Sequence, residues 1–83
     1  MEVVLCREAA EGLEALSEPI HARVLRILER LADWPHVSGA KPLSGNLAGH
    51  YRIRTGDYRL VFRLEGQTVV VVKIGHRSRL YGD

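Results

Sequence analysis

Residues 51–64, with the sequence YRIRTGDYRLVFRL, limit the fold of this chain more than any other stretch. Two runs that alternate between polar and apolar residues flank Thr55-Gly56-Asp57, where glycine accepts a positive φ and aspartate favours a turn. We therefore expect a β-hairpin whose loop is centred on Gly56-Asp57. The residues that then lie opposite one another are Arg54 and Arg59, Arg52 and Val61, and His50 and Arg63.

Side chains alternate between the two sides of a strand, so the hairpin has two unlike faces. The face expected to join the core carries Tyr51, Ile53, Tyr58, Leu60, Phe62 and Leu64. The other, which we call the arginine face, consists of His50, Arg52, Arg54, Arg59, Val61 and Arg63.

The arginine face of the hairpin carries no acidic residue. Like charges placed opposite each other destabilise a strand pair by about 0.2–1 kcal/mol, so such a face needs a reason. A solvated surface is one reading. We favour a site for a polyanion such as a phosphate backbone, because guanidinium groups bind phosphate through forked hydrogen bonds.

The composition agrees with one small domain that binds an anion. The chain has 83 residues, of which 46% are hydrophobic, and its formal net charge is only +2. The position of the charges therefore matters more than their total. The cations from His50 onward are Arg52, Arg54, Arg59, Arg63, Lys73, Arg77 and Arg79, and they face only Asp57, Glu65 and Asp83. This concentration is typical of an anion-binding surface.

Cysteine usage and hydropathy limit where the protein acts. A single cysteine, Cys6, excludes an internal disulfide and fits a reducing compartment. Cys6 lies in an apolar run and is expected to be a small buried residue. The chain shows no signal-peptide pattern and no apolar run near about 18 residues, so we expect a cytoplasmic protein that does not enter a membrane.

The first half of the chain predicts a strand and two helices. Residues 2–6 suit a strand of the same sheet, and residues 8–16 suit a helix that Gly12 weakens. Residues 20–34 give the clearest helix, with Ser17 as its cap and Pro35 ending it, while Trp34 packs at its end. Its apolar residues form a single stripe: Ile20, Val24, Ile27, Leu28 and Leu31.

The second half predicts a loop over residues 36–49 and a further strand over residues 68–75, TVVVVKIG. If a tight turn pairs this strand with the hairpin, Val70 and Val72 share the arginine face with Val61. Such apolar ground beneath the charges needs cover and would suit docking by a partner segment.

The predicted fold is therefore a single α+β domain over residues 1–83. Its N-terminal strand and two-helix hairpin pack on a small, about four-stranded, mainly antiparallel sheet.

The basic half also supplies groups for chemistry on RNA. Arginines position phosphates, Tyr81 can stack on a base for about 1–3 kcal/mol, and His50 and His76 can transfer protons near neutral pH. These groups suffice for metal-free cleavage, in which the ribose 2′-OH attacks its own phosphate while guanidinium groups hold the charge. No cluster has metal-ligand spacing, so we expect no metal and no cofactor.

Four motifs carry a family resemblance that covers nearly the whole chain. They are KPLSG at residues 41–45, YRIR at 51–54, GDYRLVF at 56–62 and GHRSRLY at 75–81. In this order they resemble the RelE/ParE superfamily of toxins from type II toxin–antitoxin systems, and its RelE-like mRNA interferases in particular. The resemblance implies metal-independent cleavage of mRNA in the ribosomal A site. It also implies a partner, a RelB-like or other small antitoxin that wraps the toxin in a hetero-oligomer.

The resemblance assigns roles by position. Arg59 matches the arginine that holds the scissile phosphate. Arg77 matches the arginine that protonates the leaving group or stabilises the transition state, and Tyr81 matches the tyrosine that stacks on the mRNA base. Arg52 and Arg54 stand where the best-known members carry paired lysines. The other substrate-binding candidates are Lys41, His50 and Arg79.

Two departures from the family pattern leave alternatives open. A guanidinium does not lose its proton in a protein, whereas a lysine can, so Arg52 and Arg54 cannot replace a lysine base. The base would be His76 or His50, or the enzyme would depend on positioning and charge alone. The short tail leaves both Arg77 and Arg79 as candidates for the catalytic arginine.

Two other functions remain as hypotheses. One is a ParE-like toxin that binds DNA gyrase and is not a nuclease, for which the arginine face and Tyr81 have no stated use. The other is an RNA- or ribosome-binding module that binds with salt dependence and leaves the RNA intact.

Overall fold

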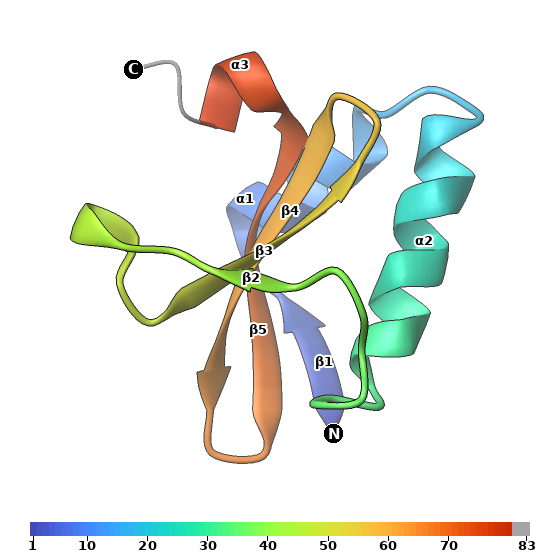
Figure 1. The fold of residues 1–83 in the computed structure, drawn as a ribbon. Helices are drawn as coiled ribbons and strands as arrows, with labels where there is room; N and C mark the ends of the chain where they lie inside the picture. The colour runs from blue at the N-terminus through green and yellow to red at the C-terminus, as the bar shows by residue number, and fades with distance from the viewer. Residues whose placement is uncertain (81–83) are drawn as a thin grey trace.

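Five strands form one sheet in the order β1-β5-β4-β3-β2 (Figure 1). The structure is a computed structural model that describes residues 1–80, with side chains as far as residue 78. The strands are β1 (Glu2–Leu5), β2 (Lys41–Pro42), β3 (His50–Thr55), β4 (Tyr58–Glu65) and β5 (Thr68–His76). β1 runs parallel to β5, and the other neighbours are antiparallel. The predicted α+β fold with a mainly antiparallel sheet is confirmed.

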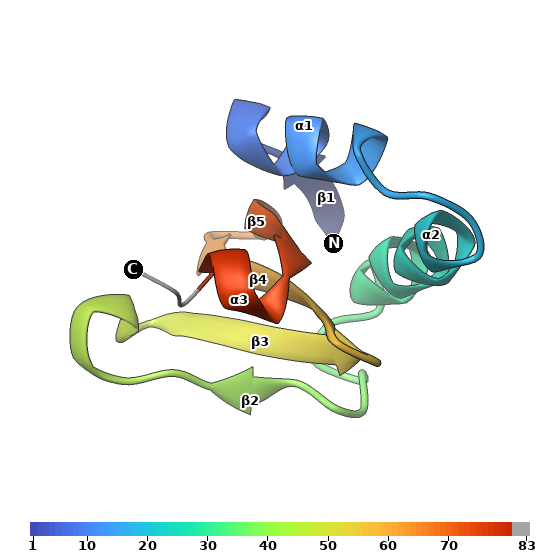
Figure 2. The ribbon, with the colours of Figure 1, turned by 90° about the horizontal axis from the view of Figure 1, so that it is seen from above.

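Two helices, α1 (Arg7–Glu14) and α2 (Ile20–Leu31), lie on the same side of the sheet (Figure 2). The core fills the space between them and the strands. Val24, Ile27 and Leu31 of the predicted stripe on α2 are buried there, together with Ala9 of α1. The sheet contributes Ile53, Leu60, Phe62, Val69, Val71 and Ile74 to this core.

An aromatic cluster closes the core where α2 ends. The ring of Trp34 lies 4.9 Å from Tyr51 and 5.3 Å from Phe62, measured between centroids, and Tyr51 stacks on Phe62 at 5.5 Å. Each such pair contributes about 0.5–1.5 kcal/mol beyond the burial of its area. Trp34 therefore packs at the helix end, as its position in the sequence predicts.

The hairpin has the predicted register. Arg54 pairs with Arg59 in the ladder between β3 and β4, and Arg52 pairs with Val61. His50 and Arg63 also lie opposite each other, and Gly56 in the loop has a positive φ of 60°. The apolar pattern and the turn thus agree on one alignment of the two strands.

A β-bulge interrupts the next ladder, between β4 and β5. Val61 pairs with Lys73, whereas the following residue, Phe62, pairs with Val71. Val72 is therefore an extra residue on β5 and has no partner in this register. Beyond a bulge, the alternation of side chains shifts by one position.

The bulge decides which residues of β5 share the arginine face. Val70 lies on it, opposite Arg63, as expected. Val72 has no partner in the ladder and is not part of the core, and the bulge gives the position opposite Val61 to the next residue, Lys73. Simple alternation from Val70 would place His76 on the arginine face, and the bulge places it on the opposite side.

Three further details differ from the sequence-based expectation. The loop over residues 36–49 contains β2, which makes the sheet five-stranded, and a 3-10 turn, η1 (Gly45–Leu47). The tail begins with one helical turn, α3 (Arg77–Leu80). The cap of α2 comes from Glu18, whose side-chain oxygen accepts a hydrogen bond of 3.2 Å from the backbone N–H of Ala22, and not from the Ser17 side chain.

The first prediction concerns Gly12, where α1 approaches β5 most closely. A Cβ on Gly12 would lie 2.1 Å from the backbone oxygen of Ile74. In an ordinary helix Gly→Ala stabilises by up to about 1 kcal/mol, whereas overpacking costs about 1–3 kcal/mol. We therefore expect Gly12→Ala to lower the free energy of unfolding, measured by urea denaturation.

The control for this prediction is the exposed Ala10 of the same helix. Ala10→Gly should cost about 0.5–1 kcal/mol, the ordinary propensity difference. A Gly12→Ala variant that is more stable than the wild type would contradict the close helix–strand contact.

Candidate nucleic-acid interface

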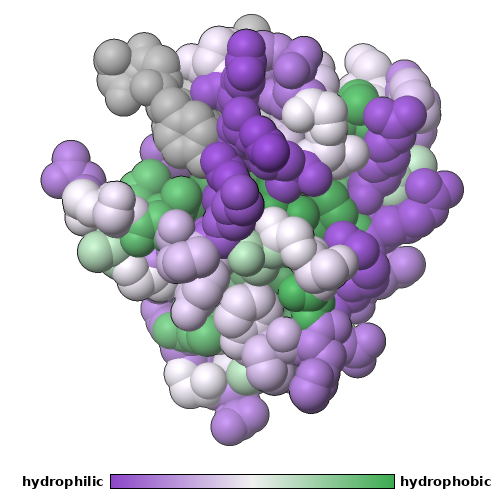
Figure 3. Space-filling view, viewed as in Figure 1, coloured by the Kyte–Doolittle hydropathy of each residue, from purple (hydrophilic) through white to green (hydrophobic). Residues whose placement is uncertain are grey.

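The arginine face lies on the side of the sheet that α1 and α2 leave uncovered (Figure 2). Figure 3 shows this side, where strongly hydrophilic residues form a band from α3 across the middle of the sheet, bordered by hydrophobic atoms. Residues paired across strands make rows on this face. One row contains Lys41, Arg52, Val61 and Lys73, the next contains Arg54, Arg59 and Gly75, and a third contains His50, Arg63 and Val70.

The rows bring together the cations that the sequence proposed as substrate-binding residues. Paired residues on neighbouring strands are about 5 Å apart, and alternate residues of one strand are about 7 Å apart. Arg52, Arg54 and Arg59 therefore form one compact group, with Lys41 beside Arg52 at the sheet edge. His50 lies on the same face, two residues beyond Arg52, about 13 Å along β3 from Arg54.

The apolar ground beneath the charges is covered by the chain itself. Val61 is fully buried and Val70 is 9% exposed. The neighbours of Val61 on this face are long cationic side chains, whose aliphatic stems can cover apolar surface. Of the residues expected to form a docking patch, Val61 and Val70 are therefore covered, whereas Val72 is half-buried.

Arg59 differs from the other arginines in its burial. Its side chain is only 8% exposed, and it is the one buried charged residue among those the structure describes. Arg54, directly opposite, is exposed, and Arg52 is half-buried. A guanidinium group at this depth is held in a fixed position, as a group that contacts one particular phosphate must be.

Two buried nitrogen atoms on the arginine face have no hydrogen-bond partner within the described part of the chain. They are Nε of Arg52 and Nδ1 of His50. A buried polar group without a partner costs about 1–3 kcal/mol, so native proteins rarely keep one without a reason. An oxygen of a bound phosphate would satisfy Nε of Arg52.

One arginine of the face is already neutralised. Nε of Arg63 donates a hydrogen bond of 2.8 Å to Glu65, which lies two residues further along β4 on the same side. The expectation that this face carries no acidic residue holds for residues 51–64. Glu65, the last residue of β4, adds a carboxylate to the same face. Arg63 is therefore less available to a ligand than Arg52, Arg54 or Arg59.

The tail starts beside the hairpin loop. The backbone N–H of Arg77 donates a hydrogen bond of 2.9 Å to the carbonyl of Asp57. This contact places Arg77, which is exposed, at the Arg54–Arg59 end of the sheet. The predictions for the Arg79 side chain and for Tyr81 fall outside the described residues.

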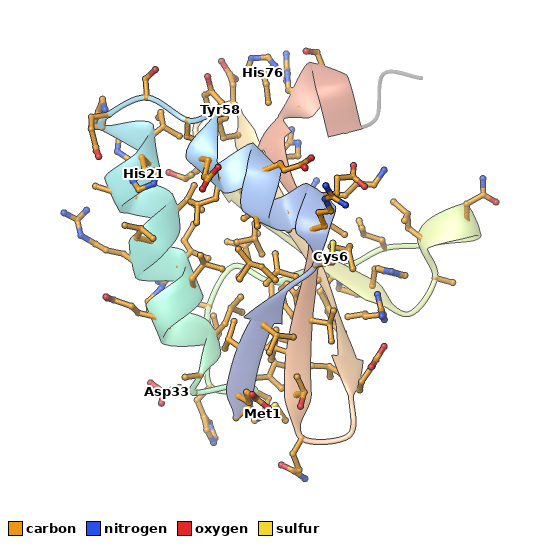
Figure 4. The ribbon with its side chains drawn as sticks, turned by 180° about the vertical axis from the view of Figure 1, so that it is seen from behind. Met1, Cys6, His21, Asp33, Tyr58 and His76 are labelled. Atoms are coloured by element: carbon orange, nitrogen blue, oxygen red, sulfur yellow. The ribbon has the colours of Figure 1, made fainter. Side chains whose placement is uncertain are left out.

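His76 lies on the other side of the sheet from the arginines. It pairs with Tyr58, and their rings meet edge to face at 5.3 Å (Figure 4). Its Nδ1 lies 2.9 Å from the Ser78 hydroxyl oxygen and accepts a hydrogen bond of 3.2 Å from the Ser78 N–H. These residues line an open groove of about 600 Å³ against α1. The structure thus does not bring His76 together with Arg59.

Sequence reasoning missed one cation of this face, Lys73. Four consecutive valines precede it, so no polar–apolar alternation shows which side of the strand it occupies. Its place opposite Val61 follows from the bulge alone.

The described residues contain no group of three or more histidine, cysteine, aspartate or glutamate side chains that could hold a metal ion. Among the same residues, no helix is long and apolar enough to cross a membrane.

Comparison with known proteins gives consistent matches over most of the chain. A family model described as the ParE toxin of the type II toxin–antitoxin system parDE matches residues 3–81. Toxin RelE of Mycobacterium tuberculosis is 34% identical over 82 residues, which cover 95% of this chain and 84% of that toxin. Toxin RelG of the same organism is 42% identical over 43 residues, a match that spans 49% of each chain.

Solved structures share the fold. A chain of the M. tuberculosis toxin–antitoxin complex RelBE2 superposes with a TM-score of 0.78 at 33% identity, covering 92% of this chain and 96% of that chain. The isolated E. coli RelE toxin superposes with a TM-score of 0.75 over 98% of this chain and 90% of that chain. Its identity is 20%, so it supports the fold alone.

The second prediction tests whether repulsion between arginines on this face lowers the free energy of unfolding. Arg54 and Arg59 are like charges directly opposite each other. Arg54→Gln should therefore raise the free energy of unfolding by about 0.2–1 kcal/mol at low salt, measured by urea denaturation. The effect should shrink as salt screens the charges.

The matched control is Arg7→Gln, which removes an exposed arginine 3.5 Å from Glu11 on α1. That change should leave stability unchanged or slightly lower. If Arg54→Gln destabilised the protein as Arg7→Gln does, the arginines would not be repelling each other.

Proposed function

The chain belongs to the RelE/ParE superfamily of toxins from type II toxin–antitoxin systems, and from this we propose that it is a ribosome-dependent endoribonuclease. It would cleave mRNA in the ribosomal A site without a metal ion. The observation that carries the proposal is the cluster of arginines on one face of the sheet. Arg59 is buried at its centre, and Nε of Arg52 is buried without a hydrogen-bond partner among the described residues.

In the proposed reaction the ribose 2′-OH attacks the adjacent phosphorus, and the bond to the 5′ oxygen breaks. Negative charge builds on the phosphate oxygens in the transition state, where fixed guanidinium groups stabilise it. Arg59 would hold the scissile phosphate, and Arg52 and Arg54 would bind the strand around it. The leaving 5′ oxygen would take a proton from water, and Arg77, whose backbone lies beside the hairpin loop, would stabilise the negative charge on that oxygen, with Arg79 as the alternative.

Positioning and charge account for this site better than a histidine base. His76 lies on the helix side of the sheet, against Tyr58. His50 shares the arginine face but lies four residue pairs away from the row that contains Arg59, roughly 13 Å along the strand. A base must lie within hydrogen-bond reach of the proton that it removes. We therefore propose that the 2′-OH proton passes to water. Tyr81 would stack on the mRNA base.

We also propose that a cognate small antitoxin binds this protein in a hetero-oligomer. The support is the relative at 33% identity, whose structure is a toxin–antitoxin complex. The arginine face would attract acidic side chains of such a partner as well as RNA.

A second candidate function is that of a ParE-like toxin that binds DNA gyrase. This candidate is favoured because the family model that matches residues 3–81 is the model of the ParE toxin. The two candidates differ in their use of the arginine face, which a gyrase binder does not need for phosphoryl chemistry.

The third prediction separates these functions. Primer extension on a defined mRNA, translated in vitro by ribosomes, should show new cuts in the A site when the protein is added. Because Arg59 would hold the phosphate in the transition state, Arg59→Ala should lower cleavage by at least about 100-fold, the usual loss for one such donor. His76→Ala should retain cleavage, because its ring lies on the other side of the sheet.

The matched control is Arg26→Ala, which removes an exposed arginine from α2 on the other side of the molecule. It should cleave like the wild type. An intact message in cells that the protein still arrests, together with inhibited gyrase supercoiling, would replace the nuclease by the gyrase candidate.

A further inference from the structure

The β-bulge at Val72 brings an amine to the arginine face that neither the sequence pattern nor the family resemblance assigns. We propose that Lys73 is an additional substrate-binding residue, which contacts a phosphate of single-stranded RNA next to the scissile one. This inference rests on the proposed function only in placing RNA on this face.

The register gives Lys73 its position. It pairs with Val61, which pairs with Arg52, and Arg52 pairs with Lys41. These residues form a row that crosses four strands, with its cations separated by about 5 Å between neighbouring strands and about 10 Å across the valine. The row that contains Arg59 runs beside it, about 7 Å away along the strands.

Lys73 lies on the same face as Arg59 and close to it along the sheet. Gly75 pairs with Arg59, and Lys73 lies two residues before Gly75, so the Cα atoms of Lys73 and Arg59 are about 8–9 Å apart. This separation is within reach of two long side chains that bind neighbouring phosphates of one strand. His76 lies on the opposite side of the sheet from Arg59. His50 lies on the same side as Arg59, but four residue pairs away along the strands.

The side chain of Lys73 is half-buried, and its charge is not taken up by an acidic partner among the described residues. Lys73 borders Val61, which is fully covered. Among the described residues, Lys73 takes part in no ion pair, whereas Arg63 on the same face is paired with Glu65. A lysine amine binds phosphate as a point charge with three donors, so it needs no forked geometry.

Lys73 also changes how the substrate lies. Without it, the cations of the face follow the hairpin, and RNA would run along β3 and β4. With Lys41 and Lys73 at its two ends, the row extends the positive surface across the sheet from β2 to β5. The strand is therefore expected to cross the sheet, with Arg59 beside the crossing.

The fourth prediction measures the phosphate contact directly. A fluorescent single-stranded RNA with 2′-O-methyl groups, which cannot be cleaved by 2′-OH attack, is titrated with the full chain at several KCl concentrations. Each phosphate contact contributes about 0.7 to the slope of log Kd against log[KCl] for a single strand. Lys73→Met keeps the aliphatic stem over Val61 but removes the charge, and it should lower the slope by about 0.7.

Two further variants make the result specific. Lys73→Arg keeps the charge and should keep the wild-type slope. Arg26→Met removes a charge from the exposed side of α2 and should also keep it. An unchanged slope for Lys73→Met, with wild-type binding intact, would overturn the inference, as would an equal fall in the slope for Arg26→Met.

This experiment is separate from the test of the proposed function. A wild-type protein that binds the RNA with the expected slope change in Lys73→Met, yet leaves ribosome-bound mRNA intact, contradicts the nuclease proposal and supports the Lys73 contact. A wild-type protein that does not bind the RNA at low salt overturns the contact, whatever the ribosome assay shows.

Discussion

The alternation of side chains along β4 is the constraint on which the rest of the structure depends. This one strand sends Leu60 and Phe62 into the core and Arg59 and Val61 to the opposite face. A shift of one residue would exchange these two sets and bury arginines beneath the helices. The same register therefore builds the core and the candidate interface, and neither can change without the other.

The second constraint is the bulge at Val72, which changes which residues of β5 point into the core. Before it, alternation puts Val69 and Val71 in the core. After it, Ile74 takes the core position, while Lys73 faces the arginines. One extra residue thus separates His76 from the candidate site and supplies a cation to it. Bulges commonly re-aim side chains next to functional sites in this way.

The sequence predicts those features that have a strong local signal. The hairpin register follows from alternation on both sides of Gly56, and α2 follows from its apolar stripe. Other features lack such a signal. The two residues of β2 are too few to show a period, and the run of four valines before Lys73 has no polar residue to reveal the bulge. The exclusion of His76 from the candidate site could be seen only in three dimensions, because it depends on that bulge.

The measurement that tests the account most directly uses valine methyl groups of β4 and β5 as reporters of the two faces of the sheet. In NMR spectra of the full chain, adding 2′-O-methyl single-stranded RNA should shift the methyl signals of Val70, which lies opposite Arg63, and of Val61. The signals of Val69 and Val71, which point into the core, should move far less. Shifts confined to Val24 and Ile27 on α2, or equal shifts for both sets, would contradict an RNA-binding arginine face.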